Sequence, residues 1–108
     1  MRVVIDASVD PRLLEAFVDC YVQTFFDLGW QHLKDHVLVK QLECDVFITA
    51  DQGFEHEHDL KSLRFGIVIV PVARSKIAFY RPIFPQLLQA VATIRAGDVV
   101  HVYGPPAD

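Results

Sequence analysis

Apolar residues in this chain gather in short continuous runs that polar segments separate. A run that is apolar throughout is typical of a strand buried on both faces, because a strand with one face in water alternates apolar and polar residues. The runs, together with one segment rich in strand-forming residues, predict five strands. These strands are expected at residues 3–5, 20–25, 45–51, 65–72 and 98–103.

Three of the segments between the strands have the three-to-four-residue apolar spacing of helices. Asp10 followed by Pro11 is a typical helix start, because Asp10 can cap free amides and proline needs no amide partner. The polar segment 52–59 lacks this spacing, and we expect it to be irregular and anchored by Phe54. The expected helices cover residues 11–19, a segment that starts at Asp35 and ends at Glu43, and a segment from Pro82 to a stop at Gly97.

Strands that alternate with helices predict an α/β fold, a three-layer α/β/α sandwich around a mainly parallel sheet of Rossmann-like type. The length of 108 residues fits one domain covering residues 1–108. With 52% hydrophobic and 22% charged residues, the composition favours a well-packed globule over a disordered chain.

The chain has no apolar run near the length of about 20 residues that a membrane span needs. Its first residues carry charge too early for a signal peptide. The two cysteines are too few for a disulfide framework. We therefore expect a cytoplasmic protein with two free thiols and no membrane association.

Two aspartates, Asp6 and Asp51, each stand at the carboxyl end of a predicted strand. In parallel sheets, ligands bind outside the carboxyl ends of the strands. Converging carboxylates there favour an oxygen-preferring cation such as Mg²⁺ or Mn²⁺, and Asp35 could add a third carboxylate. Two alternatives remain open: Asp6 and Asp51 could only shape turns, and Asp35 could only cap its helix.

Other catalytic patterns are absent from the sequence. The five histidines and two cysteines lack the spacing of a zinc site. The nucleophile elbow Gly-x-Ser-x-Gly does not occur, and the five glycines are isolated rather than gathered in a phosphate-binding loop. These absences disfavour zinc enzymes, serine hydrolases and the common nucleotide-binding proteins.

An ordered set of motifs gives the chain a family resemblance. The set comprises Val-Val-Ile-Asp at 3–6, Asp-Leu-Gly-Trp-Gln-His-Leu-Lys-Asp at 27–35, Asp-Val-Phe-Ile-Thr-Ala-Asp-Gln-Gly-Phe at 45–54 and Gly-Ile-Val-Ile-Val-Pro at 66–71. In order and spacing it resembles the small, stand-alone PIN-like proteins of prokaryotes, over almost the whole chain.

The resemblance implies a sandwich fold and a metal-dependent ribonuclease, since active PIN domains use Mg²⁺ or Mn²⁺ and many are toxins of toxin–antitoxin pairs. It implies that Asp6, Asp35 and Asp51 are the catalytic, metal-binding acids. The chain departs from the family pattern at two positions, where relatives often have acids: Ala7 and Gly53. These departures keep a second class open, a catalytically degenerate PIN-like module that acts through protein association.

The distribution of acidic and basic residues along the chain indicates which partners it could bind. Net charge is −4, yet residues 1–59 hold twelve acidic and four basic residues, whereas residues 60–97 hold six basic residues and no acidic one. A basic segment beside an acidic site suits RNA, and we expect Arg74 and Lys76 to contact the phosphate backbone.

The apolar stretch 77–85 predicts an interface, in a homodimer or with an antitoxin. A Rossmann-like enzyme acting on a small phosphate ester is a third interpretation.

Overall fold

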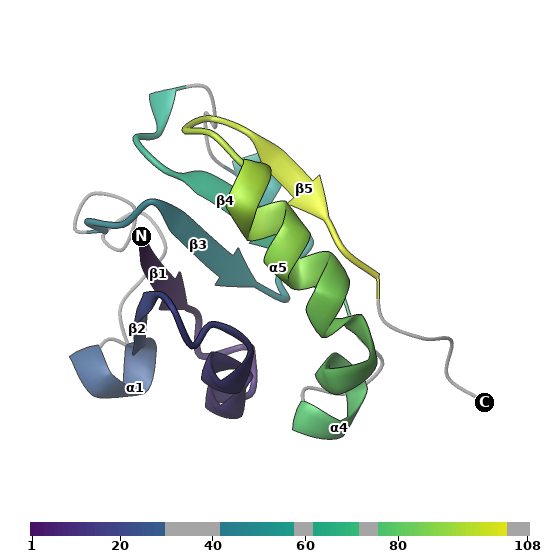
Figure 1. Cartoon of the computed structure of the whole chain (residues 1–108). Coiled ribbons are helices and arrows are strands. Elements are labelled where there is room, and N and C mark those ends of the chain that lie inside the picture. The colour runs from purple at the N-terminus through teal and green to yellow at the C-terminus, as the bar shows by residue number, and fades with distance from the viewer. Residues whose placement is uncertain (30–41, 58–61, 72–75, 104–108) are drawn as a thin grey trace.

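Five parallel strands form a single sheet in the order β2-β1-β3-β4-β5 (Figure 1). The computed structural model describes residues 1–29, 42–57, 62–71 and 76–103. Within these ranges, none of the helices is long and apolar enough to cross a membrane. The strands are β1 (Arg2–Ile5), β2 (Tyr21–Thr24), β3 (Val46–Thr49), β4 (Gly66–Ile69) and β5 (Val99–His101). The helical segments are the 3₁₀ helices η1 (Pro11–Ala16) and η3 (Arg81–Ile83) and the α-helices α1 (Phe25–Leu28), α3 (Phe54–Glu57), α4 (Ile77–Tyr80) and α5 (Phe84–Thr93).

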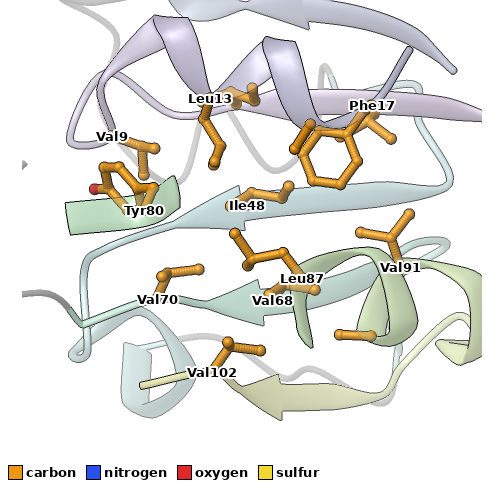
Figure 2. Packing of buried hydrophobic residues seen from close by; sticks show 14 of the residues in the cluster. Val9, Leu13, Phe17, Ile48, Val68, Val70, Tyr80, Leu87, Val91 and Val102 are labelled. Atoms are coloured by element: carbon orange, nitrogen blue, oxygen red, sulfur yellow. The ribbon is translucent and has the colours of Figure 1, made fainter. Parts of the chain in front are cut away.

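The sheet has an apolar core on each face, because successive side chains of a strand point to opposite sides. On the first face, Leu13 of η1 and Leu87 of α5 pack against Ile48 of β3 (Figure 2). On the second face, Phe54 of α3 packs against Phe47 of β3, with 5.3 Å between their ring centroids. Both faces are therefore covered, which confirms the expected three-layer α/β fold and the anchoring role of Phe54.

Two local capping arrangements follow from the sequence. Asp10 caps η1 by accepting a hydrogen bond from the amide of Arg12, and Pro11 takes the first helical position, as expected. Thr24 and Asp27 cap α1 reciprocally: the Thr24 amide donates to the Asp27 carboxylate, and the Asp27 amide donates to the Thr24 hydroxyl. The α1 cap directly follows the carboxyl end of β2, and the η1 cap lies in the loop that leaves β1.

The structure differs from the sequence predictions mainly in its helical segments. The first helical segment is a 3₁₀ helix that stops at Ala16 instead of an α-helix to residue 19. The segment 52–59, expected to be irregular, contains α3. The last helix, expected from Pro82 to a stop at Gly97, covers Phe84–Thr93 as α5. Its buried face comprises Leu87, Ala90 and Val91, so Leu88 is 44% exposed. The helix expected from Asp35 lies outside the described residues up to position 41.

The connections between strands cover alternate faces of the sheet. The β3–β4 connection carries α3 on the second face, whereas the β4–β5 connection carries α5 on the first face. Both connections step in the same direction along the sheet, so they have opposite hand. Because nearly all parallel crossovers are right-handed, the α5 connection is an exception.

Candidate metal site at the carboxyl edge of the sheet

The strand order places a topological switch point between β1 and β3. From β1 the chain crosses to β2 over the first face, and from β3 it crosses to β4 in the opposite direction over the second face. Diverging connections leave a crevice at the carboxyl ends of two such strands, where open α/β sheets bind their ligands. Asp6 directly follows β1, and Asp51 comes two residues after β3. The two predicted strand-end acids therefore flank this switch point.

Asp6 is held in place by three donors. Its Oδ1 accepts a hydrogen bond from the amide of Ala7 at 2.8 Å. Its Oδ2 accepts from the hydroxyls of Ser8 at 2.6 Å and Thr49 at 2.8 Å. The amide of Asp6 continues the sheet by donating to the carbonyl of Ile48 at 2.9 Å. The carboxylate thus has a fixed orientation at the end of β1.

Thr49 connects the two acids. Its side chain is fully buried, and its hydroxyl donates to Asp6 while accepting from the amide of Asp51 at 3.1 Å. Asp51 is exposed, and its Oδ1 accepts from the amide of Gly53 at 2.9 Å. The carbonyl of Asp51 accepts from the amide of Phe54, which begins α3. One buried hydroxyl therefore fixes the positions of both strand ends.

Carboxylate and hydroxyl oxygens are hard ligands of the kind that Mg²⁺ and Mn²⁺ prefer. In residues 1–29, 42–57, 62–71 and 76–103, no group of three or more histidine, cysteine or acidic side chains could hold a metal ion. Asp35, the predicted third carboxylate, lies outside the described residues. Mg²⁺ usually keeps several waters and uses one or two protein carboxylates. Asp6 and Asp51 fit that mode of binding, in which the cation would orient a water and offset charge on a phosphate.

The predicted RNA-contacting residues are only partly described. Lys76 is exposed and directly precedes α4. The next amide, that of Ile77, donates to the carboxylate of Asp10 at 2.8 Å. This bond ties the start of α4 to the loop that leaves β1. Lys76 therefore lies near the same carboxyl edge of the sheet as Asp6. Arg74 lies outside the described residues.

A histidine–glutamate pair at this edge was not identified from the sequence. His101 ends β5, and its Nε2 lies 2.8 Å from Oε1 of Glu55 in α3. The rule that identified Asp6, a polar residue at the carboxyl end of a strand, also applies to His101. Ser8 and Thr49 were missed as well, although each stands two residues from a predicted acid. Hydroxyl residues beside strand-end carboxylates are the signal that could have found them.

Three hollows in the described surface are lined by residues other than Asp6 and Asp51. One, of about 370 Å³, opens at the amino edge and is lined by Arg2, Leu42, Glu43, Cys44, Asp45 and Arg64. The carboxylate of Asp45 is already engaged, since it accepts a hydrogen bond from the amide of Arg2 at 2.8 Å. Burial raises the pKa of the Cys44 thiol to about 12, so the thiol stays protonated and is a poor nucleophile. The candidate acids Asp6 and Asp51 therefore lie at the carboxyl edge, and the amino-edge hollow offers no reactive thiol.

We compared the chain with known proteins. No protein-family model, no curated protein and no solved structure matches it. The chain is a small α/β domain with a five-stranded parallel sheet.

Proposed function

We propose that this chain is a metal-dependent ribonuclease of the PIN-like type and a candidate toxin of a toxin–antitoxin pair. The observation that carries the proposal is that the hydroxyl of Thr49, at the switch point of the sheet, binds both the carboxylate of Asp6 and the backbone amide of Asp51. Two acids that follow adjacent strands at a ligand-binding edge support this proposal, because Mg²⁺ usually binds through one or two carboxylates.

The acidic, hydroxyl and basic residues of the site have separate roles in this proposal. Asp6 and Asp51 hold the cation together with its waters, and Asp35 is the third candidate acid. The ion would supply a water of lowered pKa and neutralise charge developing on the phosphodiester. Ser8 and Thr49 orient the carboxylate of Asp6. Lys76, near this edge, and the candidate Arg74 bind the RNA backbone.

The test combines metal binding with cleavage. Mn²⁺ should raise the melting temperature of the wild type, and Asp51→Asn should abolish this shift, because binding to the native state alone stabilises it. Wild type should cleave single-stranded RNA with Mn²⁺ or Mg²⁺ and stop when EDTA is added. Asp51→Asn should be inactive, whereas Asp19→Asn, which changes an exposed acid between η1 and β2, should retain full activity.

Two results would overturn the nuclease proposal. Equal cleavage by wild type and Asp51→Asn would identify a contaminating nuclease. A wild type that shows neither a metal-dependent melting shift nor cleavage of any RNA in a broad panel would exclude the metal site. Lys76→Ala should weaken RNA binding and reduce its salt dependence, which a structural lysine would not do.

A second candidate function is that of a catalytically degenerate module acting through protein association. A different observation favours it: four large apolar residues are exposed where η1 meets the start of β2. They are Met1, Leu14, Val18 and Tyr21, with exposed fractions of 55%, 46%, 83% and 60%. The stretch 77–85, from which the interface was first inferred, buries Ile77, Tyr80 and Ile83.

This second candidate predicts self-association or an antitoxin contact through that apolar surface. Light scattering at micromolar concentration should give the mass of a dimer, and Val18→Lys should restore the monomer mass of 12.3 kDa. A wild type that remains at 12.3 kDa throughout would exclude the homodimer.

A further inference from the structure

An exposed aromatic pair follows the carboxyl end of β5. The rings of His101 and Tyr103 are nearly parallel, with an interplanar angle of 14° and 6.3 Å between centroids. Tyr103 is 67% exposed, whereas the structural tyrosine Tyr80 is completely buried. Exposing a large aromatic ring beside a second ring has little structural benefit, since neither ring contributes to the two cores.

The pair is held rigidly by the element that begins at the candidate metal site. Asp51 starts the turn into α3, and Glu55 of α3 contacts Nε2 of His101 at 2.8 Å. This contact fixes the imidazole ring against which Tyr103 stacks. The contact lies at the surface, where the side chains of His101 and Glu55 are 33% and 24% exposed. A continuous series of contacts therefore runs along the carboxyl edge from Asp51 to Tyr103.

We propose that Tyr103, with His101 behind it, is a stacking platform for an unpaired nucleobase of a single-stranded RNA. This inference rests on the proposed function, because it supplies the base contact that the acids and Lys76 do not. Exposed aromatic rings bind single strands through the faces of their bases, with little dependence on sequence. A strand whose phosphate lies at Asp6 and Asp51 would carry a neighbouring base to this platform.

The exposed tyrosine at the opposite end of the sheet provides a matched control. Tyr21 is 60% exposed at the start of β2, and the guanidinium of Arg2 lies 5.7 Å from its ring centroid. Replacing Tyr21 removes as much exposed aromatic surface as replacing Tyr103 does. It does so far from the carboxyl edge, at the amino end of an edge strand.

The experiment measures binding without chemistry, by fluorescence polarisation of labelled oligoadenylate RNA in EDTA. Tyr103→Ala should weaken binding about 5- to 150-fold, the range for loss of one stacked base. Tyr103→Phe and Tyr21→Ala should bind like wild type. An abasic strand of equal length should bind wild type and Tyr103→Ala equally, since it has phosphates but no base. Melting temperatures confirm that each variant is folded.

Each remaining outcome separates this platform from the nuclease. Unchanged oligoadenylate binding by Tyr103→Ala, or an equal loss for the abasic strand, overturns the platform even if wild type cleaves RNA with Mn²⁺. Base-dependent binding through Tyr103 without cleavage in any divalent metal overturns the nuclease and leaves the platform. A wild type that binds neither strand overturns the platform, and cleavage is then judged separately.

Discussion

Replacing Asp10 should cost this domain a large part of its stability, because one buried carboxylate joins two distant segments. It caps η1 through the amide of Arg12 at 3.0 Å and holds the start of α4 through the amide of Ile77 at 2.8 Å. Losing an aspartate cap costs about 0.5–2 kcal/mol. Leaving the buried Ile77 amide without a partner costs about 1–3 kcal/mol. Asp10→Ala should therefore lower the free energy of unfolding by about 1.5–5 kcal/mol.

Urea unfolding followed by circular dichroism measures this loss. The exposed guanidinium of Arg12 adds little, since ion pairs in water are weak. Asp10→Asn keeps one acceptor oxygen and should lose about half as much. Glu15→Ala is the control: this exposed acid of η1 contacts Arg81 only at 3.5 Å and should change stability by less than about 0.5 kcal/mol.

The pH dependence tests the same reasoning. Hydrogen bonding from the Arg12 side chain, with the amides of Arg12 and Ile77, lowers the pKa of Asp10 below its ordinary value of 3.8. Stability contributed by a carboxylate with a lowered pKa is present above the unfolded value and is lost as the pH falls through the folded value. The difference between wild type and Asp10→Asn should be complete at neutral pH and shrink below pH 3.8. A difference that stays constant into acid, or a Glu15→Ala loss as large as that of Asp10→Ala, would refute this account.

Three further substitutions or reactions test other parts of the fold. Thr49→Val removes the hydroxyl that donates to Asp6 and should cost about 1–3 kcal/mol in urea unfolding; an unchanged midpoint would contradict the bridging role. Gly66→Ala would place a Cβ 2.6 Å from Cγ1 of Ile94, so its melting should show a loss of about 1–3 kcal/mol, and a more stable variant would show that this contact relaxes freely. Cys44, with its pKa raised to about 12 by burial, should resist iodoacetamide in the folded protein and react rapidly in urea; equal rates would argue against burial.

The strands and the two strand-end acids could be predicted because they depend on short-range patterns. Apolar runs give the strands, and Asp10 with Pro11 gives a helix start regardless of the rest of the chain. The short helix α3 was missed because its sequence, Phe-Glu-His-Glu, contains one apolar residue, Phe54. A single apolar residue gives no helical period. Its burial against Phe47 depends on packing between segments, which the local pattern does not contain.

Two other features depend on three-dimensional arrangement. The face covered by α5 follows from an exceptional crossover, and the usual handedness rule would have placed this helix on the other face. The contact of His101 with Glu55 joins residues 46 positions apart and requires β5 to lie beside β4. The sequence contained both residues but no spacing that related them.

The hydrogen bonds at the switch point divide the work of folding and binding between the two acids. The carboxylate of Asp6 accepts from one amide and two hydroxyls, whereas the Asp51 carboxylate accepts from the Gly53 amide. The Thr49 hydroxyl has a single proton, which goes to Asp6, and toward Asp51 the hydroxyl acts only as an acceptor. Asp6 is therefore compensated mainly by the protein. Among contacts between the described residues, the Asp51 carboxylate keeps more of its acceptor sites for a cation, since a carboxylate has about four such sites. Folding should accordingly depend more on Asp6, and metal affinity more on Asp51.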